Sequence, residues 1–201
     1  MDRPVDLPSD PLFTEYPYPI ASALVLFGGI ADAGAEFGYM IDPLFILCQA
    51  ALETGNFTSS LHRNALNSFG MMHRSDPASP QIGATDSGFA EYADRYDAAW
   101  DYFKRQQDFG IDKSITDPLT YANAVKSSGY AEDPDYISKW MAIWNGIDHK
   151  DWAQAVLTEY GAPLDGGSGP DGGSVTGTGR KLEPWVWAGL AAIAAKFARL
   201  W

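Results

Sequence analysis

The sequence has a single cysteine, Cys48, among its 201 residues. One cysteine excludes an internal disulfide, and with it the class of small secreted domains that disulfides hold together. Cys48 lies in the apolar run Leu44–Leu52, which predicts a small buried core residue. The three histidines, His62, His73 and His149, lack the spacing of a metal site. We therefore predict no metal and no cofactor.

Basic residues are also scarce. Fourteen Lys and Arg stand against 26 Asp and Glu, so the net charge of the chain is −12. After Gly161 there are four basic and three acidic residues, which leaves +1 on the tail and −13 on the part before it. An acidic body repels nucleic acid, and we predict no nucleic-acid partner. It also repels anionic bacterial wall polymers, so an action on the wall would depend on short-range contacts.

Long hydrophobic runs are few in the N-terminal part. The apolar stretch Ile20–Ile30 is shorter than the roughly 20 residues that cross a bilayer. Residues 1–18 carry four acidic residues against Arg3, the opposite of the charge at the start of a secretion signal. We therefore predict neither a signal peptide nor a membrane span there, and the cellular location stays open.

The sequence does contain a repeated signal for the start of a helix. Asp-Pro occurs three times before a helix-like stretch, where Asp caps free amides and Pro suits the first helical position. A Gly closes each of these stretches, as is usual just past a helix end. With two further helices indicated by apolar spacing, the predicted helices cover about residues 43–54, 95–108, 118–128, 134–145 and 150–160.

Three other segments complete the predicted body. Residues 1–19 are rich in Pro and predict an extended arm. The Ala-rich segment 20–37 predicts a buried helix that is interrupted or loosened at Gly28-Gly29. Residues 74–88 combine Pro, Gly and Ser without a helical period, which favours a small β-hairpin or irregular lobe. The fold class is thus mainly α, with a domain over residues 20–163.

The composition changes after Gly161. Residues 164–181 are rich in Gly and Ser and predict a flexible linker. Residues 182–201 are apolar again and predict a hydrophobic C-terminal helix with Trp at both ends. This helix could dock on a membrane or on a protein partner, such as a component of a phage virion.

Glu53 lies at a position where a charged carboxylate is unfavourable. It ends the apolar run that starts at Leu44, and only Gln49 interrupts that run. At a helix C-terminus a carboxylate faces the negative end of the helix dipole, and no Lys or Arg lies within one turn. Burial and the dipole both raise the pKa of a carboxyl group, and glycosidic bond cleavage requires such an acid. The alternative is a surface Glu on a frayed helix end.

Four motifs in order carry a family resemblance. Gln49–Gly55 reads QAALETG, Asn67–Met71 reads NSFGM, Phe89–Tyr92 reads FAEY and Gly129–Tyr136 reads GYAEDPDY. In these motifs the chain resembles the glucosaminidase family of bacterial and phage cell-wall hydrolases, and the match runs from about Ile20 to Gly146. The resemblance implies a lysozyme-like helical fold.

The resemblance also implies roles for individual residues. Glu53 resembles the general acid, and Tyr130 resembles the aromatic hydroxyl beside the cleaved bond. Asp86 is the nearest candidate for a second catalytic carboxylate, with Glu91 next, although Asp is one methylene shorter than the Glu expected. The residues predicted to bind substrate are Gln49, Asn67, Phe69 and Tyr136. Phe69 could equally be core, and Tyr136 shares one helical face with two tryptophans, for which core packing is the default.

Three functions follow from these patterns. The first is an endo-β-N-acetylglucosaminidase that cleaves peptidoglycan glycan strands, associated with a phage virion, in which Asp86 activates water or the acetamido group of the substrate assists. The second is a lytic transglycosylase, which needs only one acid. The third is a wall-binding or assembly protein without catalysis, which the acidic surface and the tail would suit.

Overall fold

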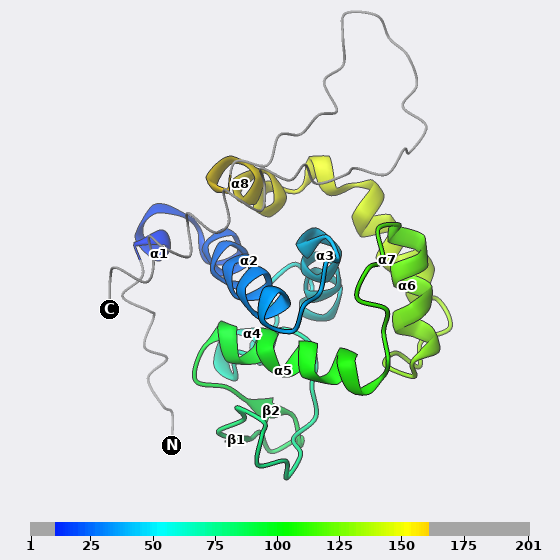
Figure 1. The fold of residues 1–201 in the computed structure, drawn as a ribbon. Coiled ribbons are helices and arrows are strands. Elements are labelled where there is room, and N and C mark those ends of the chain that lie inside the picture. The colour runs from blue at the N-terminus through cyan, green and yellow to red at the C-terminus, as the bar shows by residue number, and fades with distance from the viewer. Residues whose placement is uncertain (1–10, 161–201) are drawn as a thin grey trace, which may run out of the picture.

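The computed structural model describes residues 11–160. Helix α3 (Pro43–Thr54) lies at the centre of this part, with other helices around it (Figure 1). All of its residues except Leu52 and Glu53 are buried, and Cys48 is buried as predicted. The burial explains why the helix is apolar nearly all round. It also means that Glu53 is one of only two residues through which this core helix reaches the surface.

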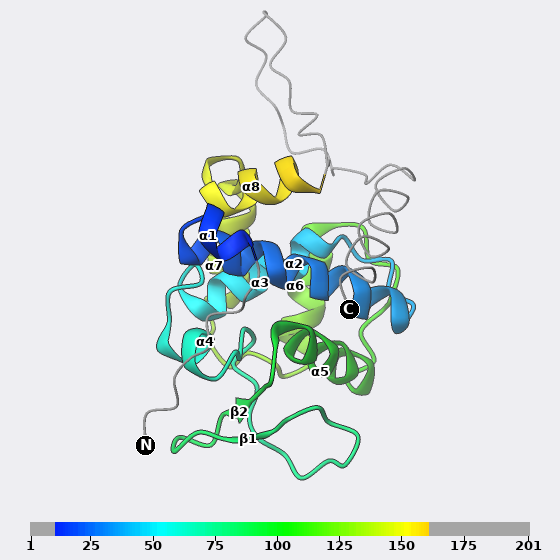
Figure 2. The same ribbon diagram turned by 90° about the vertical axis from the view of Figure 1, so that its left-hand side faces the viewer.

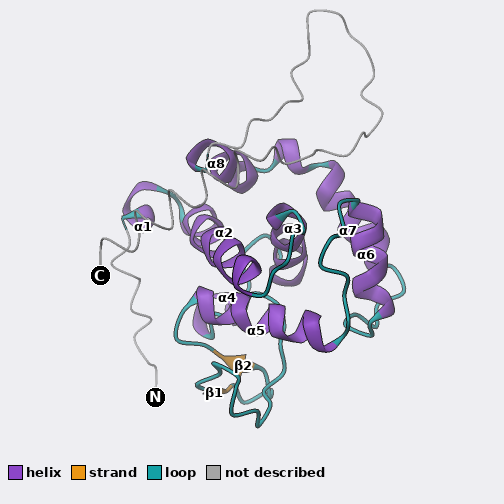
Figure 3. Ribbon diagram, in the orientation of Figure 1, coloured by secondary structure: helices purple, strands orange, loops and turns teal. Residues whose placement is uncertain are grey.

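The remaining elements surround α3 (Figure 3). The predicted mainly α fold is confirmed. The other elements are α1 (Leu12–Glu15), α2 (Tyr18–Glu36), α4 (Ser60–Asn64), β1 (Gly83–Ala84), β2 (Ala90–Glu91), α5 (Arg95–Asp108), α6 (Pro118–Ser127), α7 (Tyr136–Asn145), a 3-10 turn η1 (Ile147–His149) and α8 (Asp151–Glu159).

Two of the three Asp-Pro signals start a helix where predicted. The Asp42 carboxylate accepts a hydrogen bond from the Leu44 amide at 2.9 Å, and that of Asp117 accepts one from Thr120 at 2.6 Å. Gly55 ends α3 in the left-handed conformation at φ +57°. The third prediction is wrong by two residues, because Asp133 forms a turn with the Asp135 amide at 2.9 Å and α7 begins only at Tyr136.

Helix α2 runs without a break from Tyr18 to Glu36, so the interruption predicted at Gly28-Gly29 is wrong. Both glycines instead permit close packing. A β-carbon on Gly29 would lie 3.1 Å from the backbone of Tyr96 in α5, and one on Gly28 would lie 3.1 Å from the hydroxyl of Tyr160. Gly29 therefore lets α2 and α5 approach closely, and Gly28 leaves room for the Tyr160 hydroxyl.

The predicted lobe is present below α5 (Figure 2). Strands β1 and β2 pair antiparallel, and an isolated bridge joins Met72 to Phe89. The lobe is tied to α5 by Asp101, whose carboxylate is fully buried. This carboxylate accepts hydrogen bonds from four side chains, those of Arg74, Ser79, Gln81 and Tyr92.

The N-terminal segment differs from the predicted extended arm over its described part. Residues 12–15 form helix α1, and α2 already starts at Tyr18. By length and composition α2 could cross a membrane, and most of it is buried inside the protein. The predicted linker (164–181) and C-terminal helix (182–201) lie outside the described residues and stay predictions.

Candidate active site

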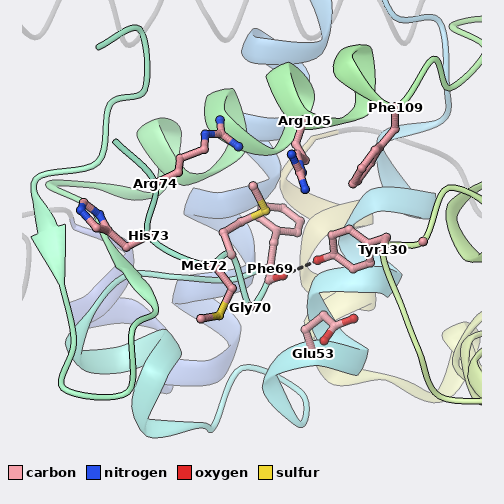
Figure 4. Close-up of a pocket in the computed structure, with 11 residues that line it drawn as sticks. Glu53, Phe69, Gly70, Met72, His73, Arg74, Arg105, Phe109 and Tyr130 are labelled. Atoms are coloured by element: carbon pink, nitrogen blue, oxygen red, sulfur yellow. Dashed lines mark hydrogen bonds between the residues drawn. The ribbon is translucent and has the colours of Figure 1, made fainter. Parts of the chain in front are cut away.

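A cleft of about 270 Å³ opens between α3, α5 and the segment that leads into the lobe (Figure 4). Glu53 enters it from the last turn of α3, and Tyr130 enters it from the loop between α6 and α7. The lining residues are Glu53, Phe69, Gly70, Met71, Met72, His73, Arg74, Arg105, Phe109, Gly129 and Tyr130. Three of the four family motifs thus meet in one cleft.

Glu53 has the properties expected of a catalytic acid. Its side chain is open to solvent through the mouth of the cleft, yet protein atoms crowd the carboxyl group. This desolvation raises the pKa of Glu53 from 4.5 to about 7. The end of α3 is firmly held, because the Thr54 hydroxyl donates to the Ala50 carbonyl at 2.6 Å and accepts from the Phe57 amide at 2.8 Å. Glu53 therefore does not lie on a frayed helix end.

Tyr130 is fixed beside Glu53. Its hydroxyl donates a hydrogen bond to the Phe69 carbonyl. Desolvation raises the pKa of Tyr130 well above its usual value, and the Glu53 charge raises it further. The hydroxyl therefore stays protonated in the physiological range, where it is a neutral hydrogen-bonding group facing the acid.

Asn67 shapes the turn that forms one wall of the cleft, and it is almost fully buried. Its amide group donates to the carbonyls of Met71 and Ala90 at 2.8 and 2.9 Å and accepts from the amides of Phe69 and Met71 at 3.3 and 3.0 Å. All of these contacts are internal, so Asn67 positions the turn and has no group left to bind substrate. Gly70, in the same turn, has φ +62°.

Gln49 also lies beneath the cleft and does not reach its surface. Its Oε1 accepts hydrogen bonds from the hydroxyls of Tyr102 and Tyr121, at 2.5 and 2.8 Å. The Tyr102 ring stacks on Phe69, with centroids 4.2 Å apart. Tyr136 is buried as well. Of the residues predicted to bind substrate, Phe69 alone lines the cleft, and the other three are buried.

The structure does not bring Asp86 to the cleft. Asp86 is exposed in the turn that joins β1 to β2, where the hairpin directs it to solvent. Glu91 lies in β2 and its Oε2 would be 2.9 Å from a β-carbon on Gly83. Within residues 11–160, Glu53 is the only acidic residue that lines this cleft. Asp86 as second carboxylate is therefore not supported by its position.

Sequence reasoning missed the cations of the cleft. Arg74 and Arg105 both line it, and neither belongs to a family motif. Arg74 pairs with the buried carboxylate of Asp101, whereas the Arg105 guanidinium lies over the Phe109 ring, 4.2 Å from its centroid. The spacing of Arg105 and Phe109 on one helix turn was the only available signal. Within the described range 11–160, no group of acidic, His and Cys residues is placed to hold a metal ion.

Residues 32–149 match the glucosaminidase family model, described as mannosyl-glycoprotein endo-beta-N-acetylglucosaminidase. The chain belongs to this family. It is therefore a glycoside hydrolase by family, as the motifs predicted. A search of curated protein sequences finds no significant match.

Two solved structures of peptidoglycan hydrolases agree with the predicted lysozyme-like fold. A peptidoglycan hydrolase from Sphingomonas sp. A1 matches with a TM-score of 0.54 and 24% identity, over 69% of this chain and 93% of that chain. A mutant of a peptidoglycan hydrolase from the same source matches with a TM-score of 0.54 and 22% identity, over 69% and 98%. A type VI secretion system effector-immunity complex from Pseudomonas protegens matches with a TM-score of 0.44 and 22% identity, over 62% and 92%.

Proposed function

We propose that this glucosaminidase-family protein hydrolyses the glycan strands of peptidoglycan as an endo-β-N-acetylglucosaminidase, with Glu53 as its general acid. The observation that supports this most directly is the position of Glu53, whose raised pKa of about 7 keeps much of it protonated near neutral pH. The acid can then donate its proton to the oxygen of the glycosidic bond as that bond breaks. The fold neighbours named as peptidoglycan hydrolases support the choice of polymer.

Tyr130 is proposed to act beside the acid. Its neutral hydroxyl lies at the cleft surface and is oriented by the Phe69 carbonyl. There it can hydrogen-bond to the sugar ring whose anomeric carbon becomes positively charged. Because Glu53 is the only acidic residue that lines the cleft among residues 11–160, we propose that the acetamido group of the substrate assists departure of the leaving group.

The decisive experiment is digestion of purified peptidoglycan with the wild-type protein, Glu53→Gln and Asp86→Asn, followed by mass spectrometry of the new chain ends. Reducing N-acetylglucosamine ends are expected. Because general acid catalysis contributes about 10²–10⁴-fold, Glu53→Gln should lose at least about 100-fold in rate. Asp86→Asn should retain most of the activity. Full activity of Glu53→Gln would refute the mechanism.

The same digest separates the other two functions. Anhydro-muramic ends would identify a lytic transglycosylase, which also needs one acid and no second carboxylate. The single acidic residue in the cleft is the observation that favours this alternative. Binding of glycan strands without any released product would identify a non-catalytic wall-binding protein. The association with a phage virion depends on residues 182–201 and stays a prediction.

A further inference from the structure

The cleft differs in charge from the rest of the protein. The whole chain has a net charge of −12, yet two arginines line the cleft against one glutamate, whose raised pKa leaves it partly neutral near pH 7. An acidic surface repels an anionic polymer at long range, so any attraction for it must come from cations at short range. Arg74 and Arg105 are the cations that line the cleft among residues 11–160.

Arg74 already forms an ion pair inside the protein. It contacts Asp101, and the Asp101 side chain is fully buried, so this pair holds the lobe on α5. A guanidinium paired with a buried carboxylate has little charge left to offer a ligand. Arg74 therefore sets the shape of the cleft more than its affinity for an anion.

Arg105 differs from Arg74 in its contacts. Within residues 11–160, no carboxylate lies within ion-pair distance of it. Its neighbour Lys104, by contrast, pairs with Asp108 at 2.6 Å. The Phe109 ring supports the Arg105 guanidinium at 4.2 Å, which fixes its plane by a cation–π contact and leaves its N–H groups free at the edge. A planar fork held on a rigid helix is suited to bind a carboxylate through two hydrogen bonds.

Figure 4 shows Arg105 and Glu53 entering the cleft from opposite sides, with Tyr130 between them. We infer that Arg105 is a substrate-binding residue, and that it binds a carboxylate carried by the muramic acid part of the glycan strand. This inference rests on the proposed function. Two groups of the strand supply such a carboxylate: the peptide attached to muramic acid, and the lactyl group once that peptide has been removed.

Three forms of one soluble glycan strand test the inference: the peptide-bearing strand, the strand stripped of peptide by an amidase, and the peptide-bearing strand with its carboxylates converted to neutral amides. The wild-type protein should have a KM at least about tenfold higher for the amidated strand, as expected for loss of a hydrogen-bonded ion pair. In the peptide-bearing strand the lactyl carboxyl is held in the amide bond to the peptide, so only the peptide supplies carboxylates there. A low KM for the stripped strand would show that the freed lactyl carboxylate binds at Arg105 as well, and a high one would show that the site requires a peptide carboxylate.

The variant Arg105→Gln should raise KM about tenfold on the peptide-bearing strand, leave kcat nearly unchanged and cause no further loss on the amidated strand. Lys104→Gln, one residue away and paired with Asp108, is the matched control and should behave as wild type. Arg105→Lys retains the positive charge without the planar guanidinium, and its KM should lie between those of wild type and Arg105→Gln. An equal loss by Arg105→Gln on all three strands would overturn the inference.

Binding separates this inference from the proposed function. Direct binding of the three strands to Glu53→Gln and to Glu53→Gln/Arg105→Gln needs no catalysis. If the wild-type protein released no product but Arg105 still discriminated between amidated and unmodified strands, the proposed hydrolysis would be wrong and the carboxylate site correct. If binding to Glu53→Gln did not distinguish these strands, the carboxylate site would be wrong whatever the activity.

Discussion

A β-carbon on Gly70 would lie 3.7 Å from Oε2 of Glu53. Gly70 combines this closeness with a left-handed backbone at φ +62°, which costs an L-residue roughly 1–2 kcal/mol. We predict that Gly70→Ala lowers the free energy of unfolding by about that amount. We also predict that the added methyl excludes water from the carboxyl group and shifts the alkaline limb of the pH–kcat profile upward.

Gly110 offers a matched control for this prediction. It has φ +69°, and a β-carbon there would meet no atom within 4 Å. Gly110→Ala should therefore lose a similar free energy of unfolding in urea denaturation and keep the wild-type pH–kcat profile. If the two variants shared one profile, the contact between Gly70 and Glu53 would have no catalytic effect.

The raised pKa of Glu53 should also be visible in stability. The folded protein holds this proton up to a pKa of about 7, whereas the unfolded chain releases it near 4.5. The folded state thus binds more protons between these values, and the free energy of unfolding of the wild type falls as pH rises from 4.5 to 7. Glu53→Gln lacks this proton and should gain stability relative to wild type across that window.

Urea denaturation at pH 4, 5.5, 7 and 8 measures this difference. The advantage of Glu53→Gln should grow from pH 4 to 7 and be constant above 7. Asp86→Asn, which removes an exposed carboxylate in the hairpin turn, is the comparison for the loss of one acidic side chain. A difference between Glu53→Gln and wild type that did not vary with pH would contradict the raised pKa.

Asn67 should be the most costly single residue of the cleft wall to replace. Asn67→Ala removes four hydrogen bonds and leaves buried backbone groups of Phe69, Met71 and Ala90 without their partner. A buried polar group left unsatisfied costs about 1–3 kcal/mol, so the loss should be at least about 2 kcal/mol. Asn123→Ala removes an exposed amide that donates to Leu119, and should cost less than about 0.5 kcal/mol. Equal losses in denaturation would contradict the role given to Asn67.

His62 should make the protein sensitive to acid. It is fully buried, with Ser22 at Nε2 and Ser68 at Nδ1, and burial lowers its pKa from 6.5 to about 3. The unfolded chain binds this proton more readily than the folded one, so stability is lost as pH falls from 6.5 toward 3. His62→Gln should be less stable than wild type at pH 7 and should lose stability less steeply below pH 6.5.

The pH dependence of unfolding by urea between pH 3.5 and 7 tests this, with His149→Gln at an exposed position as the control. A slope for His62→Gln as steep as that of wild type would show that folding does not lower the pKa of His62. The result bears on the site, because Ser68 belongs to the same turn as Phe69 and Gly70, and His62 holds that turn against α2.

The sequence by itself determined those features that one or two helix turns encode. Asp42, Pro43 and Gly55 delimit α3 because a cap carboxylate, a fixed φ and a left-handed residue act on their immediate neighbours. The apolar run before Glu53 predicted a buried helix ending in an acid, and the structure has both. The family motifs added the lysozyme-like fold, which the solved structures confirm.

Only the tertiary structure decided which distant residues meet. Gly28 and Gly29 read as a break in the sequence, but the close approach of α5 and Tyr160 makes them packing sites in a continuous helix. Asp86 is near the expected motif in sequence and yet is turned to solvent by the hairpin. Arg105 carries no motif and lines the cleft because α5, packed on α2, places it across the cleft from Glu53 at the end of α3. Local signals act over a few residues, whereas these contacts depend on how whole helices pack against one another.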